Sequence, residues 1–171
     1  GGGSNTPQSS AISDKPNLEK RVLIDWLSVS FDFITVEYDG YRSFRIDGLS
    51  PLMIQLLKFF SIDTPIDRLP RTTAVNGFQE CVMIGEHIKL QYGLRSGQTN
   101  SSGKHPIQLL MSGQGCREFE NFMNGNWSDL LAFLLANQSS IKRIDIAIDD
   151  FDAKEISIYE IEPFIKRFHY L

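Results

Sequence analysis

The segment RIDIAIDDF, residues 143 to 151, constrains the fold more than any other part of the chain. Its isoleucines fall on alternate positions, as the buried face of a β-strand requires. The other face carries Arg143, Asp145 and Asp149, although aspartate is uncommon in strands because its short side chain competes for backbone groups. We therefore expect a strand whose apolar face packs into a core and whose acidic face serves another purpose.

The composition allows one domain, or part of one, with enough apolar residues for a core, since 42% of the 171 residues are hydrophobic and 22% are charged. No apolar run is long enough to cross a bilayer and no signal peptide is recognisable, so we expect a cytoplasmic protein that does not contact membranes. The net charge of -4 argues against a general nucleic-acid binder, but it leaves room for a local basic groove. Two cysteines and three histidines form no zinc pattern.

The order of patterns along the chain predicts an α+β domain with a largely antiparallel sheet and packed helices. Residues 1 to 18 are polar, which predicts a disordered leader. We expect residues 19 to 171 to form the folded domain. Helices are expected at 51–60, 116–124, 127–138 and 157–168, with Ser50 and Ser128 as N-caps. Strands are expected at 21–31, on both sides of the turn Asp39-Gly40, in a hairpin turning at Gly85-Glu86, at 106–113 and at 143–151.

The acidic face of the 143–151 strand predicts a metal site. Carboxylates such as Asp145 and Asp149 are ligands that Mg²⁺ and Mn²⁺ prefer, and both cations keep waters for substrate phosphates. The alternative is a strand face that meets solvent, with Arg143 neutralising Asp145. Asp25, an acidic residue inside the apolar first strand, is either a satisfied buried acid or a further member of a carboxylate cluster.

A second candidate site lies in MSGQGCREFE, residues 111 to 120. Gly113 and Gly115 stand between a strand and a helix, where backbone N–H groups and the helix dipole can receive an anion. Arg117 could add a bidentate contact to a phosphate, and Glu120 falls on the same helix face as residues expected to be buried. The alternative is a tight turn with an Arg117–Glu120 pair.

No nucleophile stands out. Ser-His-Asp, Walker and Rossmann patterns do not occur in the sequence. Cys116 is either a thiol with a lowered pKa at a helix N-terminus or a small packed residue.

Three segments in the order IDWLSVSF, MSGQGCREFE and RIDIAIDDF resemble the Rep_trans family of replication initiation factors. That family contains the initiators of rolling-circle plasmids and the relaxases of some integrative conjugative elements. The resemblance covers residues from about 20 to 155. Gly-x-Gly-Cys-Arg-x-x-Glu together with the Arg-hydrophobic-Asp-hydrophobic-Ala-hydrophobic-Asp-Asp pattern is more specific than either motif alone.

The resemblance implies an endonuclease that nicks one strand of origin DNA. An active-site tyrosine attacks the phosphodiester, stays attached to the 5′ phosphate and frees a 3′ hydroxyl, with Mg²⁺ or Mn²⁺ neutralising charge on the scissile phosphate. The implied partners are single-stranded or hairpin origin DNA, a helicase and a second copy of the chain. Asp145 and Asp149 match the acidic strand of the family, and Glu120 and Arg117 match its Gly-Cys-Arg motif. Among these positions we infer that Asp145, Asp149 and Glu120 are the metal ligands, and we expect DNA or phosphate contacts from Arg117, Gly113, Gly115 and Arg143.

The catalytic tyrosine of the family follows a Gly-Ser-Arg-x-Ser-Asp segment, and nothing similar occurs before Leu171. We therefore expect the N-terminal part of a nicking domain, with the nucleophile beyond Leu171, since Tyr159 and Tyr170 stand outside that motif. The alternative function is a non-catalytic module that binds an origin through bases stacked on aromatic residues near Arg42 and Arg45; the candidate aromatics are Phe31, Tyr38, Tyr41 and Phe44. A third possibility is a remnant that only folds or dimerises.

Overall fold

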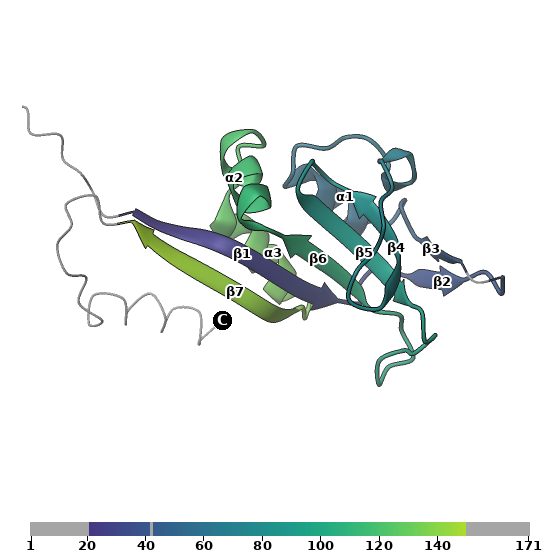
Figure 1. The fold of residues 1–171 in the computed structure, drawn as a ribbon. Helices are drawn as coiled ribbons and strands as arrows, with labels where there is room; N and C mark the ends of the chain where they lie inside the picture. The colour runs from purple at the N-terminus through teal and green to yellow at the C-terminus, as the bar shows by residue number, and fades with distance from the viewer. Residues whose placement is uncertain (1–20, 42, 150–171) are drawn as a thin grey trace, which may run out of the picture.

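The computed structural model describes residues 21–41 and 43–149. Five strands of this part form an antiparallel sheet in the order β4-β5-β6-β1-β7, and β2 pairs with β3 in a separate hairpin. The predicted α+β class and antiparallel sheet are therefore confirmed (Figure 1). The elements are β1 (Arg21–Phe31), β2 (Val36–Tyr38), β3 (Phe44–Ile46), α1 (Pro51–Lys58), a 3₁₀ turn (Ile66–Arg68), β4 (Phe78–Met83), β5 (Ile88–Leu94), β6 (Ile107–Met111), α2 (Gly113–Asn121), α3 (Trp127–Ala136) and β7 (Ser140–Asp149).

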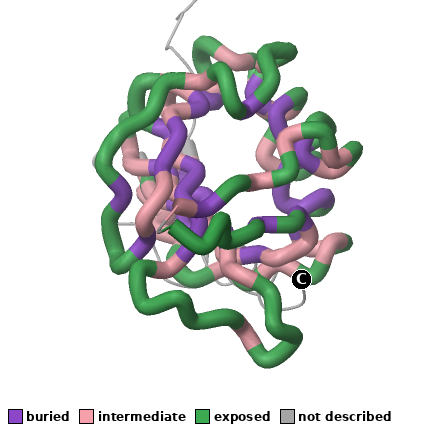
Figure 2. Tube along the Cα trace, turned by 90° about the vertical axis from the view of Figure 1, so that its right-hand side faces the viewer, coloured by how far each residue is buried: buried purple, intermediate pink, exposed green. Residues whose placement is uncertain are grey.

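The sheet and the helices form two layers with the core between them. Alternate positions of β1 and β6 are fully buried, including Leu27, Val29 and Leu109, and they belong to the same apolar cluster as side chains of all three helices. Buried stretches of the chain, purple in Figure 2, gather where strands and helices face one another. The strand residues between these positions point to the opposite face of the sheet, as the alternation of a β-strand demands.

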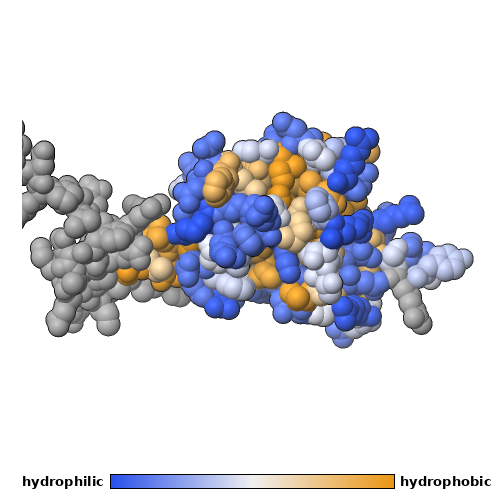
Figure 3. Space-filling view, turned by 45° about the horizontal axis from the view of Figure 1, so that its top comes forward, coloured by the Kyte–Doolittle hydropathy of each residue, from blue (hydrophilic) through white to orange (hydrophobic). Residues whose placement is uncertain are grey.

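The first half of β1 and the end of β7 extend beyond the rest of the sheet as a two-stranded arm. β6 pairs with β1 only from Leu27 to Phe31, whereas β7 pairs with β1 as far as the Arg21–Asp149 pair. Val22 and Leu23 in this arm are only partly buried, and Figure 3 shows apolar side chains at the left end of the coloured surface, where the arm lies.

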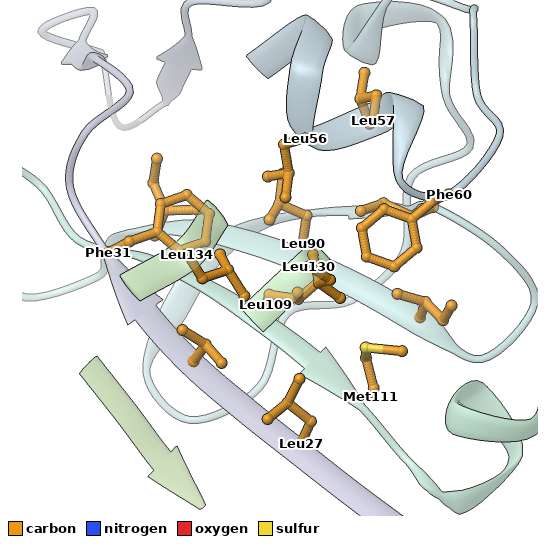
Figure 4. Close-up of a cluster of buried hydrophobic side chains, with 14 of the residues drawn as sticks. Leu27, Phe31, Leu56, Leu57, Phe60, Leu90, Leu109, Met111, Leu130 and Leu134 are labelled. Atoms are coloured by element: carbon orange, nitrogen blue, oxygen red, sulfur yellow. The ribbon is translucent and has the colours of Figure 1, made fainter. Parts of the chain in front are cut away.

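The core is filled by branched and aromatic side chains from both layers. Figure 4 shows Leu56 and Phe60 at the α1 end, Leu130 from α3, and Leu27 and Leu109 from the sheet. All five are no more than 1% exposed. Burial of each such side chain contributes roughly 1.5–3 kcal/mol, so this interface holds the sheet rigid from one side.

A β-bulge in β1 reverses the side-chain alternation at the arm. Ile24 pairs with Ile146, but Trp26 pairs with Asp145, so Asp25 is an extra residue without a cross-strand partner. As a consequence Ile24 and Leu27 lie on the core face, while Trp26 lies on the face away from the helices. In a strand of regular alternation Ile24 and Trp26 would share one face, and a bulge cannot be detected from alternation alone.

One predicted N-cap is wrong. Asn126, not Ser128, caps α3: its backbone is extended and its side chain accepts a hydrogen bond from the Asp129 N–H at 3.1 Å. Ser128 already lies inside the helix, and asparagine is as good a cap as serine. α2 also begins at Gly113, three residues earlier than expected, because Ser112 caps it by accepting from the Gly115 N–H. The expected leader at 1–18 and the helix at 157–168 lie outside the described residues.

No helix in the described ranges is long and apolar enough to cross a membrane. Cys81 and Cys116 are both buried and free.

Candidate functional site

Arg143, Asp145 and Trp26 form a group that we call the open-face cluster. The Arg143 Nε donates to the two Asp145 carboxylate oxygens at 3.0 and 3.1 Å, and Nη2 donates to the same carboxylate. The guanidinium carbon lies 4.6 Å from the centroid of the Trp26 ring. Because Trp26 and Asp145 are cross-strand partners, the backbone pairing of β1 and β7 brings these side chains together.

The open-face cluster is exposed to water, so its ion pair orients the Arg143 side chain but contributes little to the stability of the fold. The Arg143 and Asp145 side chains are 56% and 42% exposed, and exposed pairs contribute little to folding. The hydrogen bond from Arg143 nevertheless holds the pKa of Asp145 below its usual value. Among contacts of the described residues, the Arg143 Nη1 has no acceptor. The Asp145 carboxylate thus holds the Arg143 guanidinium group over the Trp26 ring. The Nη1 of Arg143 can then donate a hydrogen bond to a ligand.

A polar network continues the same face of the sheet from β1 to β5. The Gln108 Nε2 donates to the Ser28 Oγ at 3.0 Å, and the Gln91 Nε2 donates to the Gln108 Oε1 at 2.6 Å. The Val75 N–H donates to the Gln91 Oε1 at 3.0 Å, and Gln91 is completely buried. The segment containing Val75 therefore covers the β5 end of this face, while the β1–β7 end stays open to solvent.

Arg117, Glu120 and Trp127 form a second group, the helix-side cluster. The Arg117 Nη2 donates both to the Ile24 carbonyl and to the Glu120 Oε1, the second bond at 3.1 Å. The Trp127 Nε1 donates to the same Glu120 oxygen at 2.8 Å. The Glu120 side chain is only 14% exposed. These bonds connect α2 to the bulge of β1 and to α3, which matches the structural alternative for the Arg117–Glu120 pair.

The two glycines predicted to receive an anion pack against the protein itself. A Cβ at Gly113 would lie 2.8 Å from the Asp25 Oδ1, and a Cβ at Gly115 would lie 2.5 Å from the His87 carbonyl oxygen. Ser112 occupies the N-cap. The Asp25 carboxylate thus stands beside the positive end of the α2 dipole, where a negative charge is favourable. Anion binding by Gly113 and Gly115 stays a prediction, and the contacts give both glycines a packing role.

The predicted metal ligands are distributed over both faces of the sheet. Asp145 belongs to the open-face cluster and Glu120 to the helix-side cluster, and the side chain of Asp149 is not described. With a strand rise of about 3.3 Å, the Asp145 and Asp149 Cα atoms stand roughly 13 Å apart, farther than direct ligands of one ion allow. Within the described ranges, no three His, Cys, Asp or Glu residues are grouped to hold a metal. Metal binding stays a prediction.

Cys116 has the properties of a packed residue. Its side chain is completely buried, and burial raises the pKa of the thiol to about 12. Burial also raises the pKa of Cys81. Neither thiol is a thiolate near neutral pH, so the described cysteines are not nucleophiles. Tyr159 and Tyr170 lie outside the described residues.

Sequence reasoning missed Trp26 and the glutamine network. Trp26 was not among the predicted site residues, and only the bulge places it beside Arg143. Gln91 and Gln108 were detectable in principle, because each is a polar residue between apolar positions of a strand. Together these side chains offer π-surface, a guanidinium group and amides, which suit stacking and hydrogen bonding rather than covalent chemistry. No protein-family model, curated protein or solved structure matches the chain.

Proposed function

We propose that this domain binds single-stranded origin DNA as part of a replication initiation factor of the Rep_trans type. The observation that carries the proposal is the Arg143 guanidinium held 4.6 Å from the Trp26 ring on an open sheet face. Bases stack on indole rings and on guanidinium planes regardless of their identity. Phosphates accept strong hydrogen bonds from arginine, and Nη1 of Arg143 is placed to donate one.

The charge of the protein agrees with a local contact rather than a broad basic surface. The chain has a net charge of -4, so binding that relied on bulk attraction to phosphate would be weak. At the open-face cluster the Asp145 carboxylate also offsets the charge of Arg143. We therefore expect stacking to supply most of the affinity, with a shallow dependence on salt concentration.

The test is fluorescence anisotropy with a labelled oligothymidylate and the Arg143→Ala and Trp26→Ala variants. Loss of a stacking residue costs roughly 1–3 kcal/mol per base, so affinity should fall by about tenfold in each variant. Arg68→Ala is the matched control, since Arg68 is exposed in the 3₁₀ turn and its removal changes the net charge equally. Equal losses in Arg68→Ala and Arg143→Ala would overturn the proposed interface. Circular dichroism checks that each variant is folded.

Metal-assisted nicking is the second candidate function. It rests on the Asp145 carboxylate of β7, which is 42% exposed and is an oxygen ligand of the kind that Mg²⁺ and Mn²⁺ prefer. Thermal unfolding of the wild type and Asp145→Asn, each with and without Mn²⁺, tests this. A cation at about a hundred times its dissociation constant adds roughly 2.7 kcal/mol of stability. If Mn²⁺ raises the melting temperature of the wild type but not that of Asp145→Asn, the result supports a metal site at Asp145. Equal increases in both proteins contradict it.

A further inference from the structure

A groove of about 820 Å³ lies away from the open-face cluster, between the β2–β3 hairpin, the β4–β5 pair and the segment from 95 to 105. Its volume falls within the range of small-molecule sites. Six of the residues that line it are Tyr38, Phe44, Gln79, Arg95, Thr99 and His105.

Aromatic rings form the floor and one wall of the groove. Phe44 is 3% exposed and packs directly over Gly93, where a Cβ would lie 2.2 Å from the phenyl ring. The Tyr38 ring is centred 5.1 Å from that of Phe44, and the His105 ring 5.0 Å from it. Tyr38 remains 50% exposed. A planar ligand in the groove would therefore meet the accessible ring of Tyr38.

The polar residues of the groove suit a ligand that carries negative charge. Among the described residues that line it there is no Asp or Glu, although the whole chain has a net charge of -4. Arg95 is fixed in place, since its Nε donates to the Phe78 carbonyl at 3.2 Å and its backbone N–H donates to the Gly77 carbonyl at 2.9 Å. Gln79 and Thr99 add an amide and a hydroxyl that can bond to the edge of a ring.

The segment that borders the groove is held in shape before any ligand binds. The Asn100 Oδ1 accepts from the Ser102 and Lys104 N–H groups at 3.0 and 2.9 Å, and its Nδ2 donates to the Asp32 carboxylate. The Gly97 N–H donates to the Leu94 carbonyl at 2.8 Å. A preformed groove loses little conformational entropy on binding, which favours a specific ligand.

We propose that this groove holds one unpaired base of single-stranded DNA, stacked on Tyr38, with a neighbouring phosphate on Arg95. The inference rests on the proposed function and adds a second contact point to it, at the opposite end of the sheet order from β7. It assigns the stacking role to Tyr38, and the buried Phe44 ring supports Tyr38 from below.

The test compares Tyr38→Ala with Tyr41→Ala in anisotropy titrations of labelled oligothymidylate. Tyr41 is the matched control because it lies in the turn of the same β2–β3 hairpin and is 90% exposed, but is not among the residues that line the groove. Tyr38→Ala should weaken binding by about fivefold or more, whereas Tyr41→Ala and Tyr38→Phe should keep the wild-type affinity. An oligonucleotide containing 2-aminopurine should show fluorescence quenching with the wild type that Tyr38→Ala loses. Unchanged affinity and quenching in Tyr38→Ala would overturn the inference.

The same titrations separate this inference from the proposed function. Loss of binding in Arg143→Ala with wild-type binding in Tyr38→Ala overturns the groove and leaves the open-face cluster. Loss in Tyr38→Ala with wild-type binding in Arg143→Ala supports the groove and overturns the open-face interface. Absence of binding by the folded wild type overturns both.

Discussion

The protein carries two clusters built from the same three residue types, an arginine, a carboxylate and a tryptophan. In the helix-side cluster the arginine and carboxylate side chains are 30% and 14% exposed, and in the open-face cluster they are 56% and 42% exposed. A pair withdrawn from water is costly to break because a lone charge remains buried, while water replaces a lost partner at the surface. The helix-side cluster therefore holds the fold together on one side of the sheet, while the similar side chains of the open-face cluster are available to a ligand on the other side.

Glu120→Ala should give the largest effect that follows from this comparison. It removes the acceptor shared by Arg117 and Trp127, which leaves the Trp127 Nε1 without this acceptor and the Arg117 charge without its carboxylate, so we expect the unfolding free energy to fall by about 2–4 kcal/mol. Urea denaturation measures the change. Asp145→Ala is the control from the open-face cluster and should unfold at the wild-type urea concentration. Similar losses in both variants would remove the distinction between the clusters.

Gly115→Ala tests whether the start of α2 is a packing contact. The added Cβ would lie 2.5 Å from the His87 carbonyl oxygen, a backbone atom that cannot move cheaply. We expect a loss of roughly 2 kcal/mol in thermal or urea unfolding, even though alanine is the better helix former by about 1 kcal/mol. Gly113→Ala should cost less, because the Asp25 carboxylate that it meets can rotate away. Stabilisation by Gly115→Ala would show that the helix start has free space.

The reaction of Cys116 with Ellman's reagent reports on opening of the helix-side cluster. The buried thiol, with its pKa raised to about 12, should react slowly in the native protein. In Glu120→Ala the rate should rise about tenfold for each 1.4 kcal/mol of stability lost, because reaction follows the open population. Asp145→Ala should react at the wild-type rate. Mass spectrometry of the product distinguishes Cys116 from Cys81.

The smallest expected effect is the pH dependence of the open-face ion pair. The Arg143 hydrogen bond lowers the folded-state pKa of Asp145, so its stabilisation is present above the unfolded value of about 3.9 and is lost as pH falls through the folded value. The difference in melting temperature between the wild type and Asp145→Asn should stay constant from neutral pH to about 5, begin to shrink near pH 4 and vanish only below the lowered folded-state pKa. A difference that grows on acidification would contradict the assignment.

Much of the fold was predictable because helices and strands have fixed local periods. The alternation in β7, the turn at Asp39-Gly40 and Pro51 at the first position of α1 all agree with the structure. The errors occurred where two local signals competed. Ser128 and Asn126 are both good caps, and the choice between them depends on where the preceding chain becomes extended.

The candidate site was less predictable than the fold. The sequence placed Arg117 and Glu120 within reach of one another, since residues three apart on a helix are neighbours. It did not show that their pair would be buried by Trp127, nor that the contacts of Gly113 and Gly115 would be Asp25 and His87. Those neighbours come from other elements of the fold.

The sequence by itself determined the antiparallel α+β architecture and the acidic face of β7, because side-chain periodicity follows from covalent geometry. Only the tertiary structure decided which acid is buried and which is open to solvent. The bulge at Asp25 turns Trp26 toward Arg143, and the helices cover Glu120 but not Asp145. Burial and charge pairing depend on neighbours distant along the chain, and those neighbours exist only once the two layers have packed.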